Sequence, residues 1–170
     1  MINNFLRAGN FLLLVIIFII ALYTNNVFYY SVIAFAFLDA LINHILKVIF
    51  SIPRPSNCGA APNENGCPGC GTFADYSKPP KTSFGFPSGH AQSAAMITTL
   101  ITCYLLLSQS ELTLNSRILI VILWIYTFII GMSRLYFKCH SFIQVLAGFT
   151  VGIMSGLFYY YVYINVITKY

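Results

Sequence analysis

Residues 27–50 read VFYYSVIAFAFLDALINHILKVIF, with a single acid and a single Lys or Arg in the whole run. Crossing the hydrocarbon core of a bilayer takes about 20 mostly apolar residues in a helix. This run therefore predicts a transmembrane helix. Comparable runs predict four more spans, at residues 5–23, 91–108, 117–132 and 141–167. The run at 5–23 lacks a small-x-small cleavage site at its end, so we expect an uncleaved helix there and not a signal peptide.

The composition excludes a water-soluble domain. Of the 170 residues, 58% are hydrophobic and 8% are charged, whereas soluble domains carry about 25% charged residues. The nine Lys and Arg are scattered singly, so we expect no nucleic-acid partner. We predict one all-α domain over residues 1–170, a polytopic transmembrane bundle of five helices, with six spans as the alternative.

Residues 51–87 differ in composition from the rest of the chain. They hold all seven prolines, five of the eleven glycines and three of the five cysteines, which predicts an irregular extramembrane loop. With five spans, this loop lies at the same membrane face as the 133–139 turn. The end of the second helix and the start of the third and fifth helices also reach that face, where we look for chemistry.

The first polar cluster on this face is KVIFSIPRP at residues 47–55. Lys47 and Arg54 are seven residues apart, so two helical turns would return both to one side. Taken alone, the pair is more typical of interfacial cations whose aliphatic stems lie along the membrane.

The second cluster is FPSGHAQ at residues 86–92, opening the third helix. Ser88 is a natural N-cap, and Gly89 permits a ligand to approach the backbone closely. Free N–H groups at a helix N-terminus favour phosphate. Histidine side chains ordinarily titrate near neutrality, so His90 could exchange a proton with a leaving oxygen. The alternative is an ordinary helix start with an incidental histidine.

The third cluster is SRLYFKCHSFIQ at residues 133–144. If His140 and Gln144 lie on one helix, they are one turn apart on the same face. We therefore expect Gln144 to accept a hydrogen bond from one ring nitrogen of His140, leaving the other as a nucleophile. The alternative is a histidine whose hydrogen bonds are simply satisfied at the interface.

Together the clusters predict a phosphoryl site. Cations, a helix N-terminus and two histidines share one face, and such groups stabilise charge on a phosphoryl group during transfer. The chain has four acids in total and no cluster of them, so we expect neither a metal site nor a cofactor.

The three clusters resemble the tripartite motif of the type-2 phosphatidic acid phosphatase superfamily, Lys-x6-Arg-Pro, Pro-Ser-Gly-His and Ser-Arg-x5-His-x3-Asp. The resemblance covers residues 47–156. Short sequences in and around the motifs are similar to those of the dolichyl diphosphatase branch. They are PRP, HAQ, SRxY and QVLxG.

The resemblance implies a role for each matching residue. His140 would attack phosphorus and form a phosphohistidine, and His90 would protonate the leaving oxygen and later activate water. Gln144 would orient His140. The remaining matches would bind the phosphoryl oxygens. They are Lys47, Arg54, Ser88, Gly89 and Arg134.

Gln144 departs from the Asp of the superfamily motif. The dolichyl diphosphatase and glucose-6-phosphatase branches also carry Gln, so we expect an active, metal-independent phosphatase of a lipid phosphate or diphosphate in the bilayer. A polyprenyl or dolichyl diphosphate is the first choice of substrate and phosphatidic acid the second. The alternative is an inactive phospholipid-binding or structural protein of the same fold.

Other features suggest packing and sidedness. Gly148, Gly152 and Gly156 predict a helix-packing face, with a homodimer through them as the alternative. Asp39 and His44 are expected to make buried contacts between helices. Cys58, Cys67 and Cys70 could form a disulfide that holds the loop over the site or could bind zinc. We prefer the disulfide, because a structural zinc site needs four ligands and only three cysteines are local. Cys139 has no assigned role. We expect the site on the lumenal or extracytoplasmic face.

Overall fold

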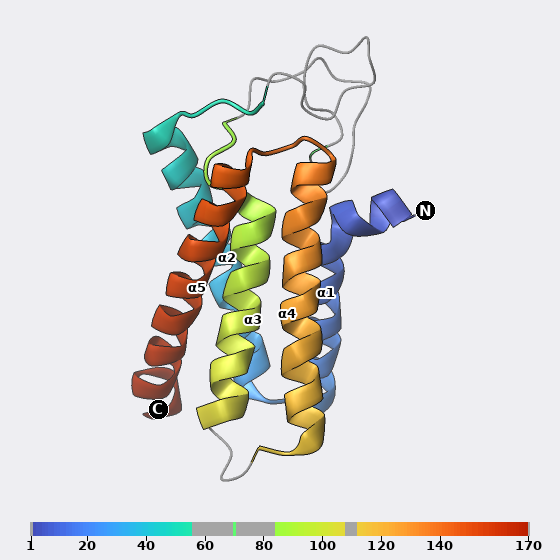
Figure 1. Cartoon of the computed structure of the whole chain (residues 1–170). Helices are drawn as coiled ribbons and strands as arrows, with labels where there is room; N and C mark the ends of the chain where they lie inside the picture. Colours follow the sequence, from blue (N-terminus) through green and yellow to red (C-terminus); the bar gives the residue numbers. More distant parts are fainter. Residues whose placement is uncertain (1, 56–69, 71–83, 108–111, 170) are drawn as a thin grey trace.

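The protein is an antiparallel bundle of long helices, described here from a computed structural model that covers residues 2–55, 70, 84–107 and 112–169. The helices are α1 (Ile2–Thr24), α2 (Val27–Phe50), α3 (Gly89–Leu107), α4 (Leu114–Tyr136) and α5 (Phe142–Asn165), followed by a short 3₁₀ turn, η2 (Ile167–Lys169). The all-α transmembrane bundle expected from the sequence is confirmed. The chain leaves α2 and α4 at the same end of the bundle at which it enters α3 and α5 (Figure 1).

Among the described residues, four segments are long and apolar enough to cross a bilayer, and all but the last coincide with a helix. They are Val27–Phe50, Gly89–Leu107, Leu114–Tyr136 and Phe142–Lys169. The apolar part of α1, Ala8–Thr24, is shorter than these four segments. The first turns of α1 bend away from the bundle (Figure 1).

The helix ends follow from local capping. Asn26 caps α2 through its side chain, which accepts from the Phe28 N–H at 2.8 Å. Ser51 ends α2 in the left-handed region, and its N–H donates to the Lys47 carbonyl at 2.9 Å. At α5, Ser141 and Gln144 form a capping box, which satisfies backbone N–H groups that a helix start otherwise leaves without partners.

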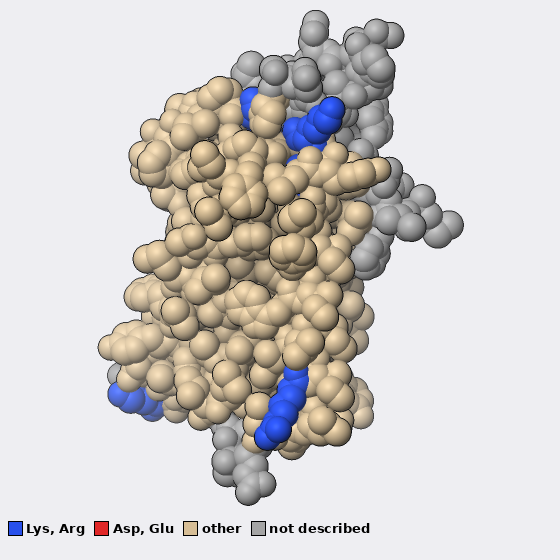
Figure 2. All heavy atoms as spheres, viewed as in Figure 1, with Lys and Arg blue, Asp and Glu red and all other residues tan. Residues whose placement is uncertain are grey.

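The bundle is centred on α3, which is buried along most of its length. The outer faces of α2, α4 and α5 instead expose large apolar side chains such as Phe37, Phe128 and Phe158. Figure 2 shows the same polarity on one face of the molecule: Lys and Arg lie near its two ends, and the band between them carries no charged side chain. This is the surface expected of a protein whose middle is solvated by lipid.

Helix α5 packs against α3 through its three glycines. A Cβ at Gly148 would lie 2.6 Å from the Ser88 carbonyl oxygen, and one at Gly156 would lie 2.7 Å from that of Met96. A Cβ at Gly152 would overlap the Gln92 carbonyl. The helix-packing prediction is therefore confirmed. In this structure α3 of the same chain occupies this face; the homodimer alternative stays a prediction.

Candidate active site

Short backbone contacts bring the three polar clusters together at one end of the bundle. The Gly85 N–H donates to the Ile52 carbonyl at 2.7 Å, and Pro53 and Phe84 form an antiparallel bridge. The Ser88 N–H donates to the Gln144 carbonyl at 2.9 Å. The segment after α2, the segment before α3 and the first turn of α5 are thereby fixed against one another.

His140 is buried, with 4% of its surface exposed, and it lies in the turn between α4 and α5. Its Nδ1 is 2.8 Å from the Gly85 carbonyl oxygen, and its Nε2 is 3.0 Å from Nη1 of Arg54. A carbonyl only accepts and a guanidinium only donates. These partners therefore assign the neutral tautomer with the proton on Nδ1 and the lone pair on Nε2.

The surroundings of His140 favour its neutral form. Burial lowers its pKa to about 3, and the positive charge of Arg54 acts in the same direction, with smaller contributions from Lys47 and His90. The hydrogen bond to the Gly85 carbonyl opposes them by raising the pKa. Burial also lowers the pKa of Arg54. At neutral pH the site holds a histidine with an unprotonated nitrogen beside cations, the form that a nucleophile requires.

The expected hydrogen bond between Gln144 and His140 is wrong. Helix α5 begins at Phe142 with Ser141 as its N-cap, so His140 lies outside the helix and the one-turn spacing does not apply. The Gln144 side chain instead accepts from the Ser141 N–H at 3.1 Å and donates to the Pro53 carbonyl at 2.8 Å. It also packs against Gly85, where a Cβ would lie 2.7 Å from its Oε1. Gln144 thus lies behind Gly85, whose carbonyl oxygen contacts Nδ1 of His140.

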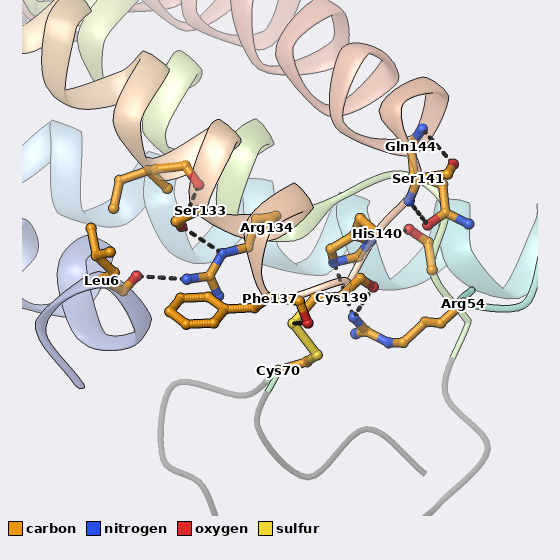
Figure 3. Close-up of a disulfide and its surroundings, with 12 residues drawn as sticks. Leu6, Arg54, Cys70, Ser133, Arg134, Phe137, Cys139, His140, Ser141 and Gln144 are labelled. Carbon is orange, nitrogen blue, oxygen red and sulfur yellow. Dashed lines mark hydrogen bonds between the residues drawn. A yellow bond between two sulfur atoms is a disulfide. The ribbon is translucent and has the colours of Figure 1, made fainter. Parts of the chain in front are cut away.

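The predicted cations fall into two groups. Arg54 lies against His140, and its Nη1 also donates to the Cys139 carbonyl at 3.0 Å. Lys47, half-buried on α2, is close enough to affect His140 electrostatically. Arg134 points the other way, toward α1 (Figure 3): its Nη2 donates to the Leu6 carbonyl at 2.7 Å. The structure therefore does not bring the Arg134 side chain to Arg54 and His140.

The start of α3 carries the second cluster. Ser88 is fully buried, and its Oγ has no hydrogen-bond partner among the described residues. Gly89 is required by close packing, because a Cβ there would lie 2.9 Å from Oδ1 of Asn43. His90 is half-buried, and its carbonyl accepts from Nδ2 of Asn10 at 2.8 Å. The segment that leads into α3 thus contacts both His140 and the first turn of α5, and a helix N-terminus with its N–H groups is a site that favours phosphate.

A polar network behind the site ties α2 to α3. Gln92 donates from Nε2 to Oδ1 of Asp39 at 2.9 Å, and its Oε1 accepts from Nδ2 of Asn43 at 2.8 Å. Asn43 also donates to the Pro87 carbonyl at 3.4 Å. The prediction that Asp39 makes a buried contact between helices is confirmed. The same prediction for His44 is wrong, because its side chain is exposed.

A cavity of about 560 Å³ between α1, α2 and α3 extends from the start of α3 into the membrane-spanning part. Gly89 and His90 line its polar end, and Phe11, Leu14 and Phe37 contribute apolar walls.

The cysteine prediction needs correction. Cys70 forms a disulfide with Cys139, to which the sequence analysis assigned no role. The two residues are 69 positions apart, so no local spacing indicated the pair. Cys58 and Cys67 lie outside the described residues. Within the described part of the chain, no group of three His, Cys, Asp or Glu side chains could hold a metal ion.

Comparison with known proteins identifies the class. The model of the PAP2 superfamily matches residues 12–167, so the chain belongs to this superfamily. The resemblance inferred from the three motifs is confirmed.

Two curated proteins and one solved structure illustrate the relationship. Phosphatidylglycerophosphatase B of Bacillus subtilis (strain 168) is 31% identical over 74 residues, which are 44% of this chain and 36% of that protein. Dolichyldiphosphatase of Saccharomyces cerevisiae is 25% identical over 126 residues, 74% of this chain and 47% of that protein. The matches thus span less than half the length of either relative. The crystal structure of a transmembrane PAP2 type phosphatidylglycerolphosphate phosphatase from Bacillus subtilis has the same fold, with a TM-score of 0.70 and 23% identity over 96% of this chain and 74% of that one.

Proposed function

We propose that the protein is a membrane phosphatase that hydrolyses a lipid phosphate or diphosphate through a phosphohistidine on His140, without a metal ion. One observation carries this proposal: the Nε2 lone pair of a buried, neutral histidine faces Arg54. The opposite nitrogen is fixed by the Gly85 carbonyl.

The proposed first step forms a P–N bond and breaks a P–O bond. The incoming phosphoryl group displaces Arg54 from Nε2, and the guanidinium then binds a phosphoryl oxygen. Nε2 attacks phosphorus, while Lys47 and the N–H groups at the start of α3 stabilise the negative charge. The ring becomes positively charged, and the Gly85 carbonyl, already bonded to Nδ1, stabilises that charge. His90 donates the proton that the leaving oxygen takes.

In the second step, His90 removes a proton from water, which attacks phosphorus and releases His140. Ser88 and Gly89 are proposed to contact the phosphoryl oxygens at the start of α3. Arg134 stays a predicted phosphate ligand; binding there would require its side chain to leave the Leu6 carbonyl.

The proposed substrate is a lipid that enters from the bilayer. The cavity between α1, α2 and α3 supports this choice, since it joins an apolar space to the start of α3. The names of the two relatives refer to phosphatidylglycerophosphate and dolichyl diphosphate. For this chain we keep a polyprenyl diphosphate as first choice and phosphatidic acid as second.

We place the site on the extracytoplasmic or lumenal face. The Cys70–Cys139 disulfide beside His140 supports this orientation, because disulfides persist in oxidising compartments. Labelling Lys138, exposed beside the site, with a membrane-impermeant amine reagent in a Lys138-only background tests the placement.

The second candidate is an inactive lipid-phosphate-binding protein, favoured by the neutral side chain at Gln144. The deciding experiment measures phosphate release in detergent, with excess EDTA, from polyprenyl diphosphate and phosphatidic acid. We expect release by the wild type and none by His140→Ala. Binding of these lipids by folded wild type without any release would instead support the inactive protein.

A further inference from the structure

We propose that the Cys70–Cys139 disulfide is a positioning element of the phosphate site, which holds Arg54 in place by fixing the Cys139 carbonyl. This inference rests on the proposed function for its kinetic consequences, but its structural claim can be tested without turnover.

The proposal starts from the turn that carries His140. Residues 137–140 lie outside the helices, and Lys138 has a positive φ of 54°. The Cys139 N–H donates to the Arg134 carbonyl at 2.9 Å, and the His140 N–H approaches the same oxygen at 3.4 Å. One carbonyl thus serves both residues. The Phe137 and Lys138 N–H groups donate to the Ser133 and Leu135 carbonyls at 2.9 Å. All four residues of the turn are therefore bonded to the last turn of α4, and the disulfide adds a covalent link to a distant part of the chain.

The disulfide supplies that link from a distant part of the sequence. Cys139 is fully buried, Cys70 is 5% exposed, and the two pack against Phe137 in a small apolar cluster. Figure 3 shows the bridge directly beneath the turn, between the Arg134 and Arg54 side chains.

The Cys139 carbonyl is the fixed partner of Arg54. Nη1 of Arg54 is 3.0 Å from both this oxygen and Nε2 of His140. When a phosphoryl group takes Nε2, the bond to His140 is lost and the bond to Cys139 remains. The position of the guanidinium during reaction therefore depends on the Cys139 backbone, and so on the disulfide.

The test compares Cys70→Ser with Cys103→Ser, whose thiol is free, on α3 and without a role in the site. Since a displacement of about 1 Å can lower a rate roughly 100-fold, we expect Cys70→Ser to lower kcat/KM about 10-fold to 100-fold. Cys103→Ser should match the wild type. In an Arg54→Gln background, Cys70→Ser should have no further effect on kcat/KM, because the disulfide acts on the site through Arg54.

Reduction of the folded wild type provides the same comparison without a mutation. Dithiothreitol transfers two electrons and two protons to the bridge, giving two thiols and its own cyclic disulfide. Peptide mass mapping verifies the Cys70–Cys139 bond before reduction and its loss afterwards. Activity should fall with reduction and return on reoxidation, whereas thermal unfolding checks that the bundle stays intact.

A readout that needs no substrate separates this proposal from the proposed function. With Arg54 released, the ¹⁵N-detected pKa of His140 should rise in Cys70→Ser, as in Arg54→Gln. If the pKa of His140 rises but the wild type releases no phosphate, the positioning role of the disulfide is supported and the phosphatase proposal is refuted. An unchanged pKa of His140 in folded Cys70→Ser would overturn the positioning role of the disulfide. So would effects of Cys70→Ser and Arg54→Gln on kcat/KM that multiply in the double variant.

Discussion

The protonation state of His140 is the sharpest prediction that the geometry makes. At pH 5, a pKa of about 3 leaves roughly 1% of the ring protonated, whereas the ordinary value of 6.5 would leave roughly 97% protonated. We expect His140 to remain neutral, with its proton on Nδ1, throughout pH 5–8. Below pH 6.5 the unfolded chain binds a proton that the folded one does not. Stability should therefore fall by about 1.4 kcal/mol per pH unit down to about pH 3.

Replacing Arg54 by Gln tests the cause of that low pKa. Nη1 lies 3.0 Å from Nε2, so the two charge centres would be about 4 Å apart. At that separation the repulsion is about 1 kcal/mol in water and about 4 kcal/mol at an effective dielectric constant of 20. Since 1.36 kcal/mol corresponds to one pKa unit, the pKa of His140 should rise by roughly 1 to 3. Gln keeps a donor for Nε2, so the tautomer should not change.

The assay is long-range ¹H–¹⁵N correlation on histidine-labelled protein in detergent. The chain has three histidines, and exposed His44, replaced by Gln, gives one assignment without disturbing the site. Comparison with His90→Asn gives the second. A wild-type His140 that titrates near 6.5, or that carries its proton on Nε2, would refute the assignment. A pKa that does not rise in Arg54→Gln would refute the electrostatic argument.

Three further predictions concern the packing around the site. Gly152→Leu should lower unfolding stability by about 1–3 kcal/mol or more, because its side chain overlaps the Gln92 carbonyl, while Thr150→Leu on the exposed face should not. Gln92→Leu leaves a buried carboxylate oxygen of Asp39 without its donor. It should lower the free energy of unfolding, measured by chemical denaturation, by about 1–3 kcal/mol. A smaller loss than that caused by Asp39→Asn would contradict this. Gln144→Asp removes the donor to the segment after α2 and should lower kcat/KM roughly tenfold; a gain in activity would disprove the positioning role.

The helices were predictable because a membrane span requires a long apolar run. Residues 27–50 match α2 at both ends. Helix α4 extends beyond the predicted 117–132 to Leu114–Tyr136, because hydropathy detects the apolar part of a helix and misses polar turns that continue it. Thr113 caps the start of α4 through its side chain, a signal that the hydropathy pattern did not use.

The site was predictable only in part. The motifs meet as expected, since each adjoins a helix end at one membrane face. The partner of Nδ1 is the backbone carbonyl of Gly85, and a carbonyl leaves no residue-specific signal in a sequence. Cys139 was missed because its partner is far away in the chain. Arg134 was placed by its motif alone, which does not reveal that Leu6 offers it a carbonyl.

The Gln144 position also bears on whether the site is competent. In the motif of the superfamily an Asp at this position would hold the histidine and stabilise its positive charge, so Gln suggests a loss. Here Nδ1 already has an acceptor in Gly85, and Gln144 lies behind that glycine with its amide donating to the Pro53 carbonyl. A carboxylate there could not donate, and its oxygens would face a carbonyl oxygen. The neutral amide therefore fits a site in which a backbone carbonyl orients His140, and the lack of an acid at this position is compatible with phosphoryl transfer.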